Sequence, residues 1–450
     1  MGSNWAKVSI ESIKANEKGS IAIGPFGSRL KSDNYVSDGI PVIRGTNVTA
    51  GPTFKGDFVY ITEDKADSLG ACNVYKNELV FPHRGSIGEV GFVQEDKRYV
   101  LSSSLMKLKV DEEQVNPMFL YYFFKSSTGK HELLKNASQV GTPGIGQPLS
   151  SLKSILFNKP PLVIQNKIVD VLSSVNNKLE LNNQINQTLE QMAQTLFKFW
   201  FVDFDPVKAK MNDEQPEWMD APFLSKEVAS LFPEKLVESE LGLIPEGWEV
   251  GELSDLMDFN PKRTLKKGTV APYLDMKNMP TAGHLALDIY DREMGSGTKF
   301  VNGDALLARI TPCLENGKTA FVDFLEDEQV GWGSTEYIVM RSKSDSYKYF
   351  SYFMARFEPF RKFAIQSMTG TSGRQRAQAK TVQTMPFVIP PLSILEKFDE
   401  LIAANMQLIK RHGDENKTLA ELRDTLLPKL LSGEIDLENV QVEQAKALAE

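Results

Sequence analysis

The chain has little of what disulfide-bonded, metal-binding or membrane proteins usually need. Its 450 residues include two cysteines, Cys72 and Cys313, and four histidines, with no two at metal-ligand spacing. Free, buried or half-buried thiols in a reducing cytoplasm are therefore expected. No apolar run reaches about 18 residues, so no membrane span is predicted. The first residues lack the apolar core of a signal peptide, and a cytoplasmic location is predicted.

Signatures of catalysis are also missing. No Gly-x-x-x-x-Gly-Lys-Ser/Thr motif occurs, which argues against an ATP-driven motor in this chain. The Asp/Asn-Pro-Pro-Tyr/Phe motif of amino-methyltransferases is absent too, since Leu follows both Pro-Pro pairs. Asp203 and Asp205 have no third carboxylate or base nearby, so a helix-ending turn is favoured over a metal site. We predict no catalytic and no metal-binding residue.

What the chain does contain is an internal duplication. Pro160-Pro161-Leu162 returns 230 positions later as Pro390-Pro391-Leu392, and Thr188-Leu189 returns as Thr418-Leu419 at the same offset. The loop that starts at Gly141 has a counterpart that starts at Gly370. This period is far too long for a solenoid. It predicts two tandem modules, each followed by a long helix.

Each module is predicted to be mixed α+β and mostly strand. Short apolar runs alternate with Gly, Pro, Asn and Asp, as in β-strands joined by tight turns. One helix is expected near 117–135, and its counterpart at 347–366. The predicted organisation is module 1 at 1–159, helix 1 at 160–205, a Pro-rich acidic connector at 206–244, module 2 at 245–389, helix 2 at 390–436 and a tail at 437–450.

The two long helices carry a heptad pattern with polar interruptions. Each pattern of about 35 residues would form a helix of roughly 50 Å. Neither is apolar on all sides, so each needs a partner, and antiparallel pairing of the two is predicted. A helix packed only on its own module is the alternative. The predicted seam consists of Ile168, Val175, Asn182, Ile185, Leu189, Leu196, Phe398, Asn405, Leu408, His412, Leu419, Leu422 and Leu426.

The charge is distributed unevenly along the chain. The net charge is −8, but residues 1–160 carry 19 basic against 16 acidic side chains, and residues 246–390 carry 18 of each. The excess acid lies in the helical segments and the tail. The neutral to slightly basic modules therefore allow a basic face on each.

Loops at matching positions of the two modules hold the candidate DNA-binding side chains. Gly-Pro-Phe-Gly-Ser-Arg-Leu-Lys at 24–31 offers cations, a hydroxyl and backbone N–H groups, which suit phosphate. Arg and Asn make bidentate contacts with guanine and adenine. For each residue an ordinary structural role is an equal alternative. The module 1 candidates are Ser28, Arg29, Lys31, Arg44, Thr46, Asn47, His83, Arg84, Ser86, Thr142 and Gln147. The module 2 candidates are Lys277, Asn278, Arg309, Thr311, Thr371, Ser372, Arg374, Gln375 and Arg376.

These features together resemble the specificity (S) subunit of type I restriction-modification systems. The resemblance rests on residues 24–31, on Gly-Ile-Pro-Val-Ile-Arg-Gly-Thr-Asn at 39–47 and on Ile-Gly-Glu-Val-Gly at 87–91. It also rests on the paired Pro-Pro-Leu helices and on Leu-Leu-Pro-Lys-Leu-Leu-Ser-Gly-Glu-Ile at 426–435. It covers almost the whole chain, roughly 1–436.

The resemblance implies a non-catalytic subunit with two target-recognition domains, each reading one half of a split, asymmetric site in double-stranded DNA. An antiparallel coiled coil would set the distance between the half-sites. Two adenine methyltransferase subunits, which carry S-adenosylmethionine, would dock on this chain, and restriction subunits with ATP and Mg could join. No cofactor is expected in this chain. A coiled-coil scaffold that presents two protein-binding modules without nucleic acid is the main alternative, and a stand-alone enzyme is a second one.

Overall fold

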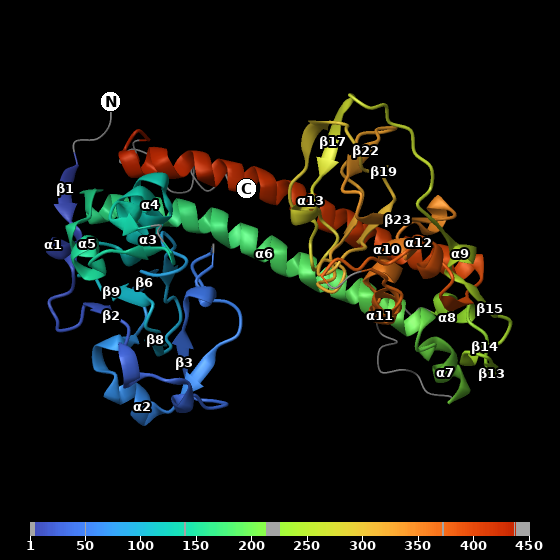
Figure 1. Cartoon of the computed structure of the whole chain (residues 1–450), viewed down its shortest axis with the longest axis horizontal. Coiled ribbons are helices and arrows are strands. Elements are labelled where there is room, and N and C mark those ends of the chain that lie inside the picture. Colours follow the sequence, from blue (N-terminus) through green and yellow to red (C-terminus); the bar gives the residue numbers. More distant parts are fainter. Residues whose placement is uncertain are drawn as a thin grey trace. The chain divides into compact units, whose positions relative to one another are not determined.

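The computed structural model describes residues 5–49, 51–138, 141–212, 226–370, 373–435 and 437 (Figure 1). It divides into two compact units. Unit 1 comprises Met1–Leu179 with Lys417–Glu450, and unit 2 comprises Glu180–Asn416. Each unit therefore contains one module and a part of both long helices.

Unit 1 is built on two four-stranded sheets. The first has the order β2-β9-β6-β7, with strands at Ile21–Ile23, Leu105–Leu108, Leu79–Pro82 and Gly91–Phe92. The second has the order β4-β3-β8-β5, with strands at Val59–Ile61, Ile40–Ile43, Tyr99–Leu101 and Asn73–Val74. Two short ladders complete the unit: β1 (Ala6–Ser9) with β12 (Leu156–Lys159), and β10 (Ala137–Ser138) with β11 (Gly144–Ile145). Its short helices are α1 (Ile10–Ile13), α2 (Glu63–Ser68), α3 (Pro117–Lys125), α4 (Ser127–Leu134) and α5 (Pro148–Ser154).

Unit 2 repeats this plan. Its sheets have the orders β16-β23-β20-β21 and β18-β17-β22-β19. The strands of the first sheet are Met257–Phe259, Tyr337–Ser342, Ala305–Ala308 and Thr319–Phe321, and those of the second are Tyr290–Glu293, Val270–Leu274, Gly331–Gly333 and Thr298–Phe300. Two ladders pair β13 (Leu236–Ser239) with β14 (Gly242–Pro245) and β15 (Glu249–Glu252) with β24 (Pro386–Ile389). The short helices are α7 (Asp205–Met211), α8 (Lys226–Ser230), α9 (Leu253–Leu256), α10 (Phe350–Arg356), α11 (Glu358–Gln366) and α12 (Ala379–Val382).

The strand before each Pro-Pro pair ends a module and leads into a long helix. These helices are α6 (Leu162–Phe201) and α13 (Leu392–Ser432), of 40 and 41 residues. In unit 2 they run antiparallel, since Asn182 bonds to Glu415 and Asn186 to His412, which precedes Glu415. The predicted α+β fold with two tandem domains and an antiparallel helix pair is confirmed.

The helix expected near 117–135 is interrupted. Ser126 separates α3 from α4, and its backbone is extended. Its hydroxyl oxygen accepts a hydrogen bond from Gly129 N at 3.1 Å and so caps α4. A serine that caps the following helix gives the chain a local alternative to continued helix. The turn brings Phe124, which is fully buried, against Phe81 of β6 with ring centroids 4.8 Å apart.

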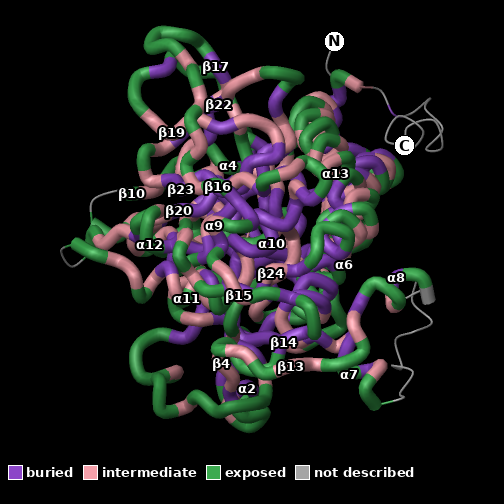
Figure 2. The backbone as a smooth tube through the Cα atoms, turned by 90° about the vertical axis from the view of Figure 1, so that its right-hand side faces the viewer, coloured by how far each residue is buried: buried purple, intermediate pink, exposed green. Residues whose placement is uncertain are grey.

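The aromatic residues of α6 form part of the core of unit 2. Phe197, Trp200 and Phe201 lie within one cluster with Phe350 and Phe398. The rings of Phe201 and Phe398 are 5.2 Å apart and nearly perpendicular, which is a favourable arrangement for aromatic pairs. In unit 2 the central strands β20 and β23 lie in the buried interior (Figure 2). The end of α6 is therefore a structural part of this module.

The predicted seam residues are all buried or half-buried. Ile168 and Val175 in unit 1 are fully buried, as is Phe398 in unit 2, and Asn182 is 1% exposed. In unit 2 the most deeply buried face of α13 carries Ile402, Met406 and Ile409. Met406 and Ile409 each lie one residue after a predicted seam position, Asn405 and Leu408. The cause is the module, because these three side chains belong to its main core cluster. Leu196 and Leu419 are buried, whereas Ile185, Leu189, Asn405, Leu408, His412, Leu422 and Leu426 are half-buried.

Candidate nucleic-acid interface

In unit 1, two predicted loops that lie far apart in the sequence are brought together. Gly85 N donates to Pro143 O and Ile145 N donates to His83 O, both at 2.9 Å. Arg84 and Gly144 form a β-bridge. This arrangement places His83, Arg84 and Ser86 beside the loop that starts at Gly141. The exposed side chains in these two loops are Arg84, Ser86, Thr142 and Gln147.

Unit 2 brings the corresponding loops together in the same way. Ala377 N donates to Arg309 O at 2.9 Å, and Thr311 N donates to Gln375 O at 3.1 Å. Ile310 and Arg376 form the matching β-bridge. Arg374 is exposed, and Arg309, Thr311, Gln375 and Arg376 are half-buried. Thr371 and Ser372 lie outside the described residues.

The chemistry of the two paired loops differs. In unit 2, Glu336 accepts hydrogen bonds from Arg376 Nε at 2.9 Å and lies 3.7 Å from Arg309 Nε. This carboxylate raises the pKa of the Arg376 guanidinium and holds two arginines side by side. In unit 1, His83 occupies the position that corresponds to Arg309, and it is 4% exposed. Burial lowers the pKa of His83, so this side chain is neutral near pH 7.

Two predicted asparagines are held by main-chain groups. Asn47 is 1% exposed, accepts from Arg44 N at 2.9 Å and donates to Asp57 O at 3.1 Å. Arg44 Nη2 also donates to Asp57 O, at 2.7 Å. Asn278 in unit 2 donates to Asp288 O at 3.1 Å. These amides shape their loops, whereas Thr46 and Lys277 beside them are exposed. Base contacts by all of these residues remain predictions.

The loop at 24–31 is fixed at its start and exposed at its tip. Gly24 N donates to Leu105 O at 2.8 Å. A Cβ on Gly24 would lie 1.8 Å from Ser102 O, so no side chain fits there. Arg29 Nη2 donates to Ser68 O at 3.3 Å. Ser28, Arg29 and Lys31 are exposed and form a small polar cluster with two cations.

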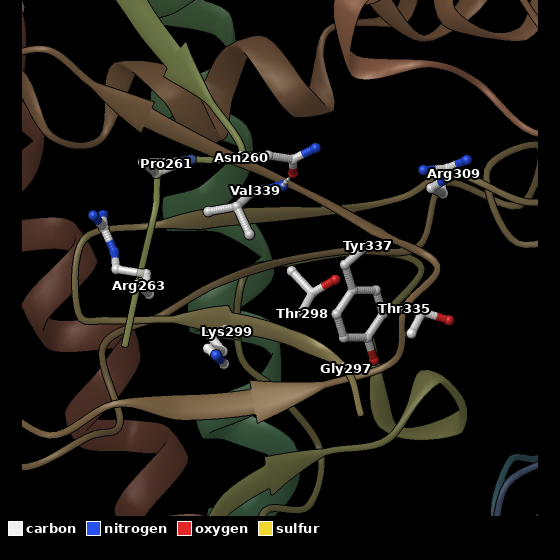
Figure 3. Close-up of a pocket in the computed structure, with 10 residues that line it drawn as sticks. All are labelled: Asn260, Pro261, Arg263, Gly297, Thr298, Lys299, Arg309, Thr335, Tyr337 and Val339. Carbon is white, nitrogen blue, oxygen red and sulfur yellow. Dashed lines mark hydrogen bonds between the residues drawn. The ribbon is translucent and has the colours of Figure 1, made fainter. Parts of the chain in front are cut away.

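Unit 2 contains a polar cavity that the sequence did not reveal. Its volume is about 420 Å³, and three cationic side chains line it: Arg263, Lys299 and Arg309 (Figure 3). Thr298, Thr335 and Tyr337 add hydroxyl groups. Of these residues, Arg309 alone was a predicted site residue. The signal that would have found the cavity is the basic segment Lys-Arg-Thr-Leu-Lys-Lys at 262–267.

Other site types find no support in the part of the chain that is described. Within those residues no group of three or more His, Cys, Asp or Glu side chains is arranged to hold a metal ion. Asp203 lies 2.5 Å from Lys198 Nζ, and Asp205 begins α7. Cys72 is buried and Cys313 half-buried, and both are free thiols. No helix in the described ranges has the length and apolarity to cross a bilayer.

Comparison with known proteins identifies the family. The profile described as "Type I restriction modification DNA specificity domain" matches the chain twice, at residues 8–191 and 245–418. The chain belongs to the family of type I restriction-modification specificity subunits. The two matches each contain one module and most of its long helix, so the internal duplication is a duplication of the family's domain.

Individual relatives agree with this assignment. The HindI specificity subunit of Haemophilus influenzae is 27% identical over 405 residues, covering 80% of this chain and 87% of the relative. The MjaIX specificity subunit of Methanocaldococcus jannaschii is 26% identical over 402 residues, covering 85% of each. A crystal structure of an S subunit from M. genitalium has the same fold, with a TM-score of 0.54 at 18% identity, covering 95% of this chain and 96% of that one. The predicted resemblance is confirmed, as is the prediction that this chain is a specificity subunit rather than a catalytic one.

Proposed function

We propose that this specificity subunit reads a bipartite, asymmetric site in double-stranded DNA, with one module for each half-site. The supporting observation is the pair of loops that recurs in both units, at residues 83–86 with 142–147 and at residues 309–311 with 374–376. The main-chain bonds that join the loops are alike, and the exposed side chains differ. A shared main-chain arrangement that carries different exposed side chains suits two different half-sites.

The pair α6 and α13 acts as the spacer in this proposal. Each helix is roughly 60 Å long at about 1.5 Å per residue. One turn of duplex DNA measures about 34–36 Å, so helices of this length are more than long enough to span half-sites about one turn apart. Polar contacts such as that of Asn182 with Glu415 fix the register of the pair.

The modification chemistry belongs to partner subunits in this proposal. Two adenine methyltransferase subunits dock on this chain and carry S-adenosylmethionine, and restriction subunits with ATP and Mg join them. A net charge of −8 favours this division, because partner subunits then supply much of the phosphate contact. We expect the isolated chain to bind DNA weakly.

The test is duplex binding by the chain alone and by the chain assembled with methyltransferase subunits. The proposal predicts tight, salt-dependent binding to one sequence by the assembled complex only. A scaffold without nucleic acid would give assembly but no duplex binding at any salt concentration. Tight, specific binding by the isolated chain would contradict the division of roles.

A further inference from the structure

The loop at 260–267 in unit 2 occupies the same place in the fold as the loop at 24–31 in unit 1. Each follows the edge strand of the corresponding sheet, β16 in one unit and β2 in the other. Asn260 N donates to Val339 O at 2.7 Å, just as Gly24 N donates to Leu105 O at 2.8 Å. A proline follows in both loops, Pro261 and Pro25. The loops are therefore counterparts, although their sequences share little else.

The start of the unit 2 loop is firmly held. Asn260 has a positive φ of 52°, and its Oδ1 accepts a hydrogen bond from Val339 N at 2.9 Å (Figure 3). Asparagine tolerates this left-handed conformation better than most side chains. The loop thus leaves the sheet in a fixed direction, as the Gly24 loop does by its close contact with Ser102.

The unit 2 loop is strongly basic. Residues 262–267 include four cations, Lys262, Arg263, Lys266 and Lys267, and no acid. The three lysines are exposed. Among the described residues, none of these lysines has an ion-pair partner within 4.0 Å. Exposed cations that are not neutralised by the protein are available to an external anion.

Arg263 extends this charge into a groove. It lines the cavity described above and a second cavity of about 420 Å³, which Arg341 and Lys343 also line. Asp304, which is fully buried, bonds to Arg263 Nη2 at 3.0 Å and lies 3.4 Å from Arg341 Nη1. Asp258 and Asp345 are the two acids that line the second cavity, and Asp345 is bonded to Arg341 at 2.5 Å. Among the residues that line the two cavities, the cations outnumber the acids, five to two.

The groove offers mainly donors. Lys299 and Arg309 lie on either side of the hydroxyls of Thr298 and Thr335 (Figure 3). The buried Nε atoms of Arg263 and Arg309 have no hydrogen-bond partner within the described residues. Guanidinium and ammonium groups match phosphate oxygens, which only accept hydrogen bonds.

Resting on the DNA-reading function proposed above, we propose that the loop at 260–267, with Lys299 and Arg309, binds the phosphate backbone of the half-site read by unit 2. The loop at 24–31, with Arg29 and Lys31, is its counterpart for the other half-site. Arg309 is thus assigned to the phosphate backbone, and sequence reading belongs to the other side chains of the paired loops. The basic groove supplies affinity without base preference.

The test compares two double variants with the same loss of charge. Lys266→Gln/Lys267→Gln removes two exposed cations from the loop at 260–267. Lys235→Gln/Lys362→Gln is the control, because these two lysines of unit 2 are 60% and 66% exposed and pair with Glu246 and Glu358 away from the groove. Each variant is assembled with methyltransferase subunits, and Kd is measured against salt for the specific duplex and an unrelated one.

The Lys266→Gln/Lys267→Gln variant is expected to bind both duplexes about tenfold more weakly at low salt, and the slope of log Kd against log salt should fall by about 1–2. The methylated sequence should stay the same, which also shows that the variant is folded. This inference alone would be overturned if the variant and the control had the same Kd and the same salt slope while the wild-type complex bound DNA normally. A changed methylated sequence would overturn it too, because the groove would then read bases. If the wild-type complex did not bind DNA at all, the proposed function itself would be refuted.

Discussion

His284 Nε2 lies 3.1 Å from Asp323 Oδ2, and the imidazole ring is completely buried. Its other nitrogen lies 3.6 Å from Glu190 Oε2 on α6, too far for a hydrogen bond but close enough for a strong charge interaction. Burial lowers the pKa of His284, but the bond to Asp323 and the charge of Glu190 outweigh it and raise the pKa to about 9. Glu190 also accepts from Tyr352 Oη at 2.6 Å, so this cluster joins α6 to the module within unit 2.

Because His284 is buried and its pKa is raised, we predict that the stability of unit 2 depends on pH. The folded pKa of His284 is above the unfolded value of about 6.5, so its stabilisation is complete below about pH 6.5 and is lost as the pH rises through about 9. His284→Gln should lower the free energy of unfolding by about 2–3 kcal/mol at pH 6, and the difference should shrink toward pH 10. Hydrogen exchange of the β20 amides measures it.

The control for this prediction is His131→Gln, since His131 is exposed on α4. It should change stability by less than about 0.5 kcal/mol at any pH. A destabilisation by His284→Gln that is independent of pH would show that the residue contributes packing rather than charge.

A buried ion pair in unit 1 gives a second prediction. Lys107 Nζ lies 2.7 Å from Glu78 Oε2, with side chains 6% and 1% exposed. Glu78→Ala should lower the free energy of unfolding by about 3–5 kcal/mol, because it leaves the ammonium group buried without a counter-charge. Glu78→Leu combined with Lys107→Met should cost much less, which denaturant unfolding measures. The exposed pair of Lys109 and Glu17 is the control, and Lys109→Ala should cost under about 1 kcal/mol.

Unit 2 contains a buried acid at the corresponding position, so the duplication extends to this feature. Asp304 precedes β20 as Glu78 precedes β6, and both acids are buried against cations of the neighbouring strands. Burial raises the pKa of Asp304, and the nearby Arg263 and Arg341 oppose that rise. Both units thus have a buried acid just before the central strand, although the acid and its cationic partners are different residue types.

The exposed arginines of the paired loops give a third prediction. Arg84→Ala in unit 1 and Arg374→Ala in unit 2 should each weaken binding by about 1–3 kcal/mol if the side chain contacts a base. Each variant should relax only one half of the methylated sequence. The two variants control for each other, and sequencing that detects methyladenine measures both. A uniform loss over both halves would point to structural damage or phosphate contact instead.

Much of this architecture could be predicted from the sequence. The repeat at an offset of 230 and the heptad pattern after each Pro-Pro pair predicted two modules and two long antiparallel helices. Polar seam residues were also visible in the sequence, and Asn182 and His412 do make contacts between the helices. Such patterns are readable because they depend on local spacing along one helix face.

Features that depend on tertiary packing could not be read in this way. The buried face of α13 is displaced toward Ile402 and Met406 because the module packs on that side. The contact between residues 83–86 and 142–147 joins segments about 60 positions apart, and no local pattern indicates it. The basic run at 262–267 was visible in the sequence, but its equivalence to the loop at 24–31 follows only from the strand order.

The helix pair gives a fourth prediction. Removing about one heptad from α6 within 171–196, with the matching residues of α13, should shorten the spacer by about 10 Å. The gap between the half-sites should then decrease by about three base pairs, or recognition should fail. The methylated sequence of cells that carry the shortened chain provides the readout. An unaltered gap would show that the helices do not set the spacing.

The most direct test of the whole account is a map of methylated adenines in cells with and without this chain. The account predicts methylation that depends on the chain and falls at one sequence with two unlike halves separated by a fixed gap of unspecified bases. A single continuous sequence, two identical halves, or methylation that persists unchanged without the chain would contradict it.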